Sequence, residues 1–334
     1  MTDTTTDRTN STDRPTDHST NHSTIDFVTA APTTGSLDVR WIHGAPPARR
    51  AEEPPIQTHH YDEHTVILRQ SKSVNYEAPF LYLLFGNDRA LLLDTGATAA
   101  PDLFPLRATV DRLLAQWLER HPREGYELIV AHSHGHHDHV AADGQFTDRR
   151  ATTVIPHDPA AVQSFFGLDP ATPDQVTTFD LGGRILEVLS SPGHHDAAIT
   201  LYDPWTAILL TGDTVLPGRL FAFDAAAYRA SLERLVAFAA TRTVTHVLGC
   251  HVEMTNRPRK IYPIGAGHQP DERAPQMTTA HLTAVRDAAT ATTGRPGVHR
   301  FDDFVLYNEP RKSDLLRLMA RGWSHKLLTT LLHR

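Results

Sequence analysis

The amino-acid sequence predicts an α/β fold in which two β-sheets pack together, helices lie outside them, and a site lies in the loops at one edge. Three observations predict this fold. Short apolar runs typical of β-strands occur in two separate groups along the chain. Segments with a helical apolar stripe occur in each group. Clusters of polar residues come directly after several of the expected strands.

The first group of elements extends from about residue 36 to residue 166. The segment 36–42 is a candidate first strand, and the continuously apolar run 127–131 is expected of a strand buried on both faces. The segment 109–120 predicts a helix with one apolar stripe, made of Val110, Leu113, Leu114, Trp117 and Leu118. The other elements expected here are strands at 64–70, 80–86, 89–96 and 152–156 and a helix at 158–166.

The second group repeats these kinds of element between residues 175 and 249. Residues 175–191 predict two strands around Gly182–Gly183, and residues 197–213 predict a hairpin that turns at Asp203–Pro204. A helix at 224–241 and a closing strand at 244–249 complete the group.

The two ends of the chain differ from this regular part. Residues 1–26 consist mostly of Thr, Asp, Ser, Asn and Arg, and so few apolar side chains cannot offset the entropy cost of ordering, which predicts a disordered tail. We expect one main domain at 27–274. Residues 275–334 are expected to form a short, partly helical C-terminal extension, with helical stretches at 277–290 and 313–328.

Composition excludes several classes of protein. The formal net charge is -7 and no block of Lys and Arg occurs, which argues against nucleic acid as a partner, because phosphate contacts need clustered positive charge. No apolar run approaches the roughly 18–20 residues of a membrane span. The single cysteine, Cys250, excludes an internal disulfide and fits a reducing compartment. We therefore expect a soluble, cytoplasmic protein; its oligomeric state is open.

A histidine cluster follows the apolar run 127–131, in the stretch AHSHGHHDHV at 131–140. Alternation in an extended segment points His134 and His136 the same way, so that two imidazoles can bind one metal ion. Asp138 and His139 fall in the turn beyond, where their side chains can reach a second ion. The alternative is a surface loop with one or two solvated histidines. Five histidines in eight positions are more than such a loop ordinarily contains, which disfavours this alternative.

Three more residues of metal-ligand type follow apolar strands: His194 in SPGHHD, Asp213 in LLTGDT and His251 in LGCHVE. Each of them alone favours a structural or surface role. Together with the histidine cluster they supply seven nitrogen and oxygen ligands, enough for two zinc ions with an open coordination position.

These motifs resemble those of the metallo-β-lactamase superfamily. SHGHHDH matches its H-x-H-x-D-H signature, and PGH, TGDT and a late histidine follow in the family's order over roughly residues 60–255. The resemblance implies a four-layer αββα sandwich and a catalytic domain at 27–274. It also implies two Zn2+ as cofactors, with Fe or Mn possible.

The resemblance further implies the role of each ligand. His134, His136 and His194 would hold one metal, Asp138, His139 and His251 would hold the other, and Asp213 would bridge them. Asp94 in LLLDTGA matches the family's acidic residue behind the site, which implies that it orients a ligand. A strand-end cap is the alternative role for Asp94.

The implied activity is hydrolysis of an ester, thioester or lactone of a small-molecule metabolite by a metal-bridging hydroxide, with Asp138 and Asp213 as the catalytic carboxylates. Glutathione as the carrier is in doubt, because PGHHDAAI departs from the glyoxalase II pattern and the C-terminal region does not match that family's helical domain. Two alternatives stay open: a phosphodiesterase or nuclease-type hydrolase, and an iron-dependent oxidoreductase of the same fold. A non-catalytic metal-binding module is disfavoured because no ligand is missing.

Overall fold

The strands of this computed structural model form two six-stranded sheets and one three-stranded sheet among the residues that the structure describes, namely residue 1, residues 24–29 and residues 33–332. The first sheet has the order β1-β2-β3-β4-β5-β6. Its strands are β1 (Ile56–Asp62), β2 (Thr65–Gln70), β3 (Phe80–Phe85), β4 (Arg89–Leu93), β5 (Glu127–Ala131) and β6 (Thr152–Val154).

The second sheet has the order β13-β12-β10-β9-β8-β7. Its strands are β7 (Val176–Asp180), β8 (Ile185–Ser190), β9 (Ile199–Asp203), β10 (Ile208–Gly212), β12 (His246–Gly249) and β13 (Gln276–Met277). The third sheet has the order β11-β15-β14, with β11 (Arg219–Ala222), β14 (Gly297–Arg300) and β15 (Val305–Asn308).

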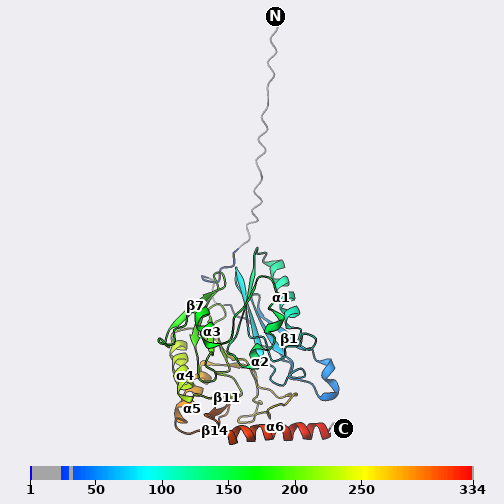
Figure 1. Cartoon of the computed structure of the whole chain (residues 1–334), viewed down its shortest axis with the longest axis vertical. Coiled ribbons are helices and arrows are strands. Elements are labelled where there is room, and N and C mark those ends of the chain that lie inside the picture. Colours follow the sequence, from blue (N-terminus) through cyan, green and yellow to red (C-terminus); the bar gives the residue numbers. More distant parts are fainter. Residues whose placement is uncertain (2–23, 30–32, 333–334) are drawn as a thin grey trace.

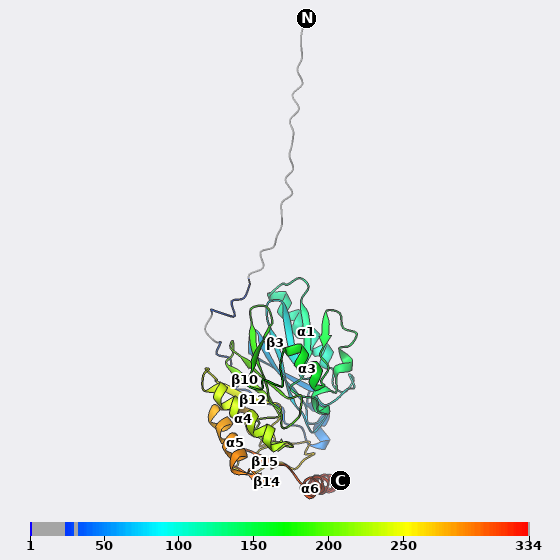
Figure 2. The ribbon, with the colours of Figure 1, turned by 60° about the vertical axis from the view of Figure 1, so that its left-hand side comes forward.

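Helices cover the outer faces of the two large sheets (Figures 1 and 2). α1 (Leu106–Arg120) packs on the first sheet, and α4 (Ala225–Ala239) and α5 (Thr279–Ala291) lie side by side on the second. The remaining helical elements are α2 (His137–Val140), α3 (Pro159–Phe166), α6 (Lys312–Leu332) and the 3-10 helices η1 (Pro47–Glu52) and η2 (Asp143–Gln145). None of the helices in the described part of the chain is long and apolar enough to cross a membrane.

Alternation along the strands separates two apolar layers. In β4, Leu91 and Leu93 face the core between the two sheets, whereas Ala90 and Leu92 face α1. In β10, Leu210 faces the same inner core and Leu209 faces α4 and α5. The predicted four-layer αββα sandwich is confirmed by these layers.

Most predicted elements form, but the candidate first strand at 36–42 is wrong. The segment forms no strand: the Ser36 N–H donates to the Tyr61 carbonyl at 3.1 Å, and further on a side chain takes over, because Gln57 Oε1 accepts from the Ile42 N–H at 2.6 Å and Gln57 Nε2 donates to the Arg40 carbonyl at 3.0 Å. The edge position belongs to β1, which pairs antiparallel with β2. Its sequence, IQTHHYD, has no apolar alternation that predicts a strand.

Most of the predicted N-terminal tail lies outside the described residues, but its last residues contact the domain. The Ile25 N–H donates to Asn87 Oδ1 at 2.9 Å, and Asn87 Nδ2 donates to the Ile25 carbonyl at 2.9 Å. Phe27, the first residue after the predicted tail, is only 7% exposed and packs edge-on against Trp205 with ring centroids 4.9 Å apart.

The predicted C-terminal extension contributes to the layers of the main domain. β13 pairs with β12, and β15 pairs in parallel with β11. α5 begins at a capping box in which Thr278 and His281 satisfy each other's backbone N–H groups. In consequence, residues 276–308 complete the second sheet and form most of the third.

Candidate metal centre

The candidate ligands meet at one edge of the sandwich because they follow strands that end there. β4 and β5 run parallel in the first sheet, and β10 and β12 run parallel in the second, so each pair ends on one side. The histidine segment that begins at His132 follows β5, Asp213 follows β10 and His251 follows β12. His194 lies in the connection between β8 and β9.

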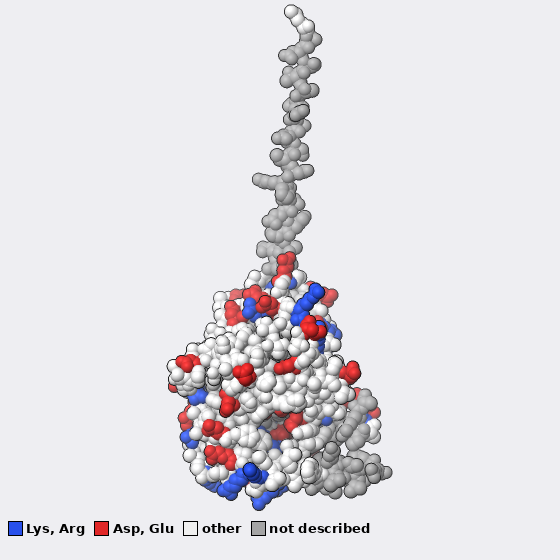
Figure 3. Space-filling view, in the orientation of Figure 1, with Lys and Arg blue, Asp and Glu red and all other residues white. Residues whose placement is uncertain are grey.

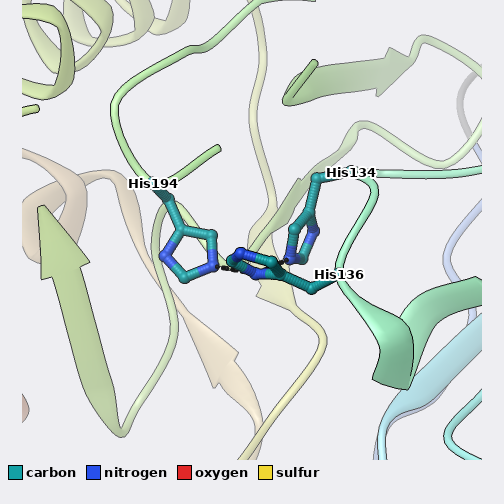
Figure 4. A group of neighbouring side chains, drawn as sticks. All are labelled: His134, His136 and His194. Atoms are coloured by element: carbon teal, nitrogen blue, oxygen red, sulfur yellow. Dashed lines mark hydrogen bonds between the residues drawn. The ribbon is translucent and has the colours of Figure 1, made fainter. Parts of the chain in front are cut away.

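Three histidines form the first ligand group. His136 Nδ1 lies 2.9 Å from His134 Nε2 and 3.0 Å from His194 Nε2. Figure 4 shows the three rings converging, with His134 and His136 from one loop and His194 from another. The predicted common direction of His134 and His136 is therefore present in the structure.

Asp138, His139, Asp213 and His251 form the second ligand group. His251 Nε2 lies 3.2 Å from Asp138 Oδ2 and 3.3 Å from His139 Nε2. Asp138 and His139 belong to the short helix α2, which turns both side chains towards His251.

Asp213, a member of the second group, also faces the first group, and it uses a different carboxylate oxygen for each. Its Oδ2 lies 3.7 Å from His194 Nε2, whereas its Oδ1 lies 3.7 Å from His139 Nε2 and 3.6 Å from His251 Nε2. The Oδ1 atom is buried and has no hydrogen-bond partner among the described residues. A carboxylate in this position can serve as a ligand to a cation in each group.

The chain fixes which nitrogen of three rings faces the centre. His194 Nδ1 donates to the Phe221 carbonyl at 3.0 Å, and His251 Nδ1 donates to the Glu77 carbonyl at 3.0 Å. His139 Nδ1 donates to Asp94 Oδ2 at 2.9 Å. Because these outer nitrogens carry the proton, each neutral ring keeps the lone pair of its Nε2 for the centre.

Asp94 is a buried acceptor behind the second group. Beyond His139, it accepts from the Ser133 N–H at 2.7 Å, the Ser133 hydroxyl at 2.9 Å and the Cys250 thiol at 3.2 Å. Its backbone φ of 69° lies in the left-handed region, as a sharp turn after β4 requires. The fully buried Cys250 thus contributes a hydrogen bond to the network behind the centre.

Two glycines allow the loops to approach closely. A Cβ at Gly212 would lie 2.8 Å from the Cβ of Ser133, and a Cβ at Gly193 would lie 2.3 Å from the backbone of Tyr228 in α4. Both also have positive φ, 53° and 127°. The glycines of TGD and PGH are therefore needed to bring Asp213 and His194 to the centre.

The two groups differ in charge. Burial and the neighbouring His139 lower the pKa of His134, so this ring is neutral and available as a ligand. In the second group burial opposes the cationic form of His251, but Asp213 and Asp138 outweigh it and raise the pKa of His251 to about 9. Asp94 and Asp213 likewise overcome burial and raise the pKa of His139. The carboxylates of this group thus favour positive charge next to them.

The donor set fits divalent metal ions. Zinc–nitrogen distances of about 2.0–2.1 Å in a tetrahedron place neighbouring ligand atoms about 3.3 Å apart. The separations given above run from 2.9 Å between His134 and His136 to 3.7 Å at Asp213, and the ligand atoms of each group all lie within 4.8 Å of one another. Imidazole nitrogens and carboxylate oxygens are also the ligand types that zinc, manganese and iron accept.

Several contacts escape prediction from the sequence. The backbone carbonyls of Phe221 and Glu77 accept hydrogen bonds from His194 and His251, and no side-chain pattern in the sequence indicates these contacts. Ser133, directly before the first histidine of the motif, is a polar residue whose type and position hint at a bond to a nearby carboxylate. His137, at the variable position between His136 and Asp138, is exposed.

Curated relatives match part of the chain. A hydroxyacylglutathione hydrolase of Rhizobium meliloti (strain 1021) is 32% identical over 147 residues, which is 43% of this chain and 54% of the relative. A hydroxyacylglutathione hydrolase of Brucella ovis is 29% identical over 147 residues, 43% of this chain and 52% of that one. The chain thus spans about half the length of the curated relatives that it matches.

Solved structures are similar at lower identity. The DIM-1 metallo-beta-lactamase has 13% identity and a TM-score of 0.45, over 72% of this chain and 99% of its own. A metallo-beta-lactamase from Pontibacter korlensis has 16% identity and a TM-score of 0.45, over 70% of this chain and 99% of its own.

A family model describes the part of the chain that carries most of the centre. The model of the metallo-beta-lactamase superfamily matches residues 77–246, half of the 334 residues. This range contains both sheets' central strands and every candidate ligand except His251, which lies just beyond it. The chain belongs to the metallo-beta-lactamase superfamily.

Proposed function

We propose that the protein is a hydrolase that uses two divalent cations, zinc in the first place, to cleave an ester, thioester or lactone of a small metabolite. One observation carries the proposal: Asp213 directs one oxygen to each ligand group, at 3.6–3.7 Å from the facing histidine nitrogens. A single-cation site has no need of such a carboxylate.

The residues divide between the two cations as the geometry suggests. His134, His136 and His194 would hold one, Asp138, His139 and His251 the other, and Asp213 would contact both. Two cations, when bound, lower the pKa of a water molecule and polarise the carbonyl that it attacks. No serine or cysteine nucleophile is then required.

The chain's own groups orient this chemistry. Asp94, Glu77 and Phe221 each hold the outer nitrogen of one histidine, so the ring cannot turn away from the centre. The carboxylates of Asp138 and Asp213 lie 3.2–3.7 Å from the inward-facing Nε2 atoms of these rings and are suited to receive a hydrogen bond from the attacking water.

The matched relatives support a thioester among the candidate substrates. Both are named hydroxyacylglutathione hydrolases, yet the match covers 43% of this chain. We therefore carry over the type of bond that is cleaved, the bond between an acyl carbon and its leaving group, and leave the carrier open.

Metal analysis combined with a substrate panel tests the proposal. We expect about two zinc ions per chain after purification in zinc-containing buffer, loss of activity on treatment with a chelator, and recovery on addition of zinc. The panel contains lactones, acyl thioesters including S-lactoylglutathione, carboxylic esters, phosphodiesters and β-lactams. We expect the lactone, thioester or ester arm to be the fastest.

Three results would contradict this function. Activity that survives chelation would exclude the metal mechanism. A phosphodiester as the fastest substrate would favour the phosphodiesterase or nuclease alternative. Iron as the bound metal, together with oxygen consumption and no hydrolysis, would favour the oxidoreductase alternative.

A further inference from the structure

Two phenylalanines lie beside the three-histidine group. Phe221 is in β11 and Phe223 follows that strand, so their side chains project from the same face. Their rings stack with centroids 5.5 Å apart and an interplanar angle of 9°. Phe223 is 49% exposed, although a large apolar side chain at the surface gains free energy when it is covered.

This aromatic pair is close to the candidate ligands. The Phe223 ring centroid lies 5.8 Å from that of His194 and 6.4 Å from that of His136. The exposed ring therefore borders the ligand group at which a substrate carbonyl would bind. A substrate held there has part of its structure within contact range of Phe223.

The pair is held rigidly by residues outside the range matched by the family model. β11 pairs in parallel with β15, and the ring of Tyr307 in β15 lies 4.7 Å from that of Phe221. The Phe221 carbonyl also accepts from His194 Nδ1. The same short strand thus orients a ligand and supports the exposed ring, which fixes the position of Phe223 relative to the centre.

We propose that Phe221 and Phe223 form the wall that binds an apolar acyl group, and that the substrate carries an aromatic ring or a medium-length alkyl chain next to the scissile carbonyl. This inference rests on the proposed hydrolase function and narrows its substrate class. A small, polar hydroxyacyl group would leave the Phe223 ring uncovered, whereas a phenyl or alkyl group would cover it.

The expected preference for longer acyl groups comes from the transfer of their methylene groups out of water onto the Phe223 ring. Burial of one methylene group corresponds to about a fourfold gain in binding, so a chain of several methylenes supplies on the order of 10- to 100-fold. Because the ring is already positioned, the gain is not reduced by ordering of a flexible wall.

A series of N-acetylcysteamine thioesters tests the wall, with acetyl, butanoyl, hexanoyl and phenylacetyl groups on the same thiol. For the wild type we expect kcat/KM to rise on the order of 10- to 100-fold from acetyl to hexanoyl or phenylacetyl. In Phe223→Ala the hexanoyl-to-acetyl ratio should fall to within about threefold of one, while Phe223→Leu should keep most of the preference for alkyl groups. Bound metal, measured on the same samples, should be unchanged in both variants.

Ile185→Ala is the matched control. Ile185 is 42% exposed and begins β8, whose other end leads to His194, so it lies at the opposite end of the sheet. Its replacement should leave the acyl preference and the rate as in the wild type.

The results distinguish a failure of the apolar wall from a failure of the proposed hydrolase function. If the wild type hydrolyses acetyl and hexanoyl thioesters equally, or if Phe223→Ala keeps the full acyl preference, the apolar wall is wrong and the hydrolase function stands. If the wild type, with both metals bound, cleaves no member of the series and no lactone or ester, the proposed function itself fails.

Discussion

Asp94 offers the sharpest test of how the centre is built, because one buried carboxylate serves three donors at the same oxygen. Its Oδ2 accepts from His139 Nδ1, the Ser133 hydroxyl and the Cys250 thiol, while Oδ1 accepts from the Ser133 N–H. Asp94→Asn keeps the size of the side chain and replaces one of these acceptors by an NH2 group. Either orientation of the amide places a donor against a donor.

The structure allows the magnitude to be estimated. If the amide oxygen stays towards the Ser133 N–H, the NH2 group faces His139 Nδ1–H, and a buried donor left without an acceptor costs about 1–3 kcal/mol. His139 can escape by moving its proton to Nε2, but Nε2 is the nitrogen that faces Asp213 at 3.7 Å and is then unable to bind a cation. We expect a loss of about 2–3 kcal/mol in unfolding free energy of the metal-free protein and a 10- to 100-fold loss in affinity for the second cation.

Two measurements on the same samples check this expectation. Urea unfolding of the metal-free protein gives the stability change, and competition with a chromophoric chelator gives the affinity of each metal. Nitrogen NMR of the imidazole of His139 reports which ring nitrogen carries the proton. Cys250→Ala is the control, because it removes only a weak thiol donor from the same carboxylate and should change metal affinity by less than about threefold.

One result would refute the reasoning. If Asp94→Asn binds two cations with wild-type affinity while His139 keeps its proton on Nδ1, then Asp94 does not orient that ligand. The strand-end cap would then be its role.

Three further predictions concern other parts of the structure. Asp213→Asn should weaken the binding of one cation and slow hydrolysis on the order of 100-fold or more, whereas His137→Ala, at an exposed residue, should change the rate little. Bound metal and the rate at saturating zinc are measured for both variants, and the opposite pattern would overturn the ligand assignment. Phe27→Ala should lower the unfolding free energy measured in urea by about 3 kcal/mol, because it removes a buried ring, 7% exposed, and leaves a cavity. The neighbouring Val28→Ala, at a side chain 70% exposed, should stay within about 0.5 kcal/mol, and equal effects of the two would show that the segment is not docked in solution. Burial lowers the pKa of His64 from 6.5 to about 4, so the unfolded chain binds a proton at higher pH than the folded one, and unfolding free energy should fall as pH drops from 6.5 towards 4. In His64→Gln, unfolding measured across that range should depend less on pH, and an unchanged slope would contradict the assignment.

The charge distribution bears on the choice among substrates. On the face shown in Figure 3, acidic side chains are scattered over most of the surface, and several basic side chains gather at the lower end of the view without forming a stripe across the face. Because phosphate contacts need clustered positive charge, a low affinity for nucleic acid stays a prediction from the composition. The phosphodiester arm of the panel examines the same point for small substrates.

The sequence by itself determined most strands of the two large sheets and the identity of the residues that gather at the centre. Apolar runs such as 127–131 form strands because only a buried layer accepts them, and polar residues directly after such strands must lie at the sheet edge. The H-x-H-x-D-H spacing determines that His134 and His136 converge, because alternation in an extended loop is a local property. For these reasons the ligand residues that the sequence indicates are close together in the structure.

Only the tertiary structure decided which groups hold those ligands and what borders them. The segment 36–42 has the alternation of a strand, yet Gln57 takes the hydrogen bonds of the Ile42 N–H and the Arg40 carbonyl, and a polar segment, β1, pairs at the edge instead. The carbonyl that holds His194 comes from Phe221, whose strand is supported by Tyr307 far along the chain. Backbone carbonyls are common to all residues and long-range pairing leaves no local pattern, so neither contact has a signature that sequence periodicity can reveal.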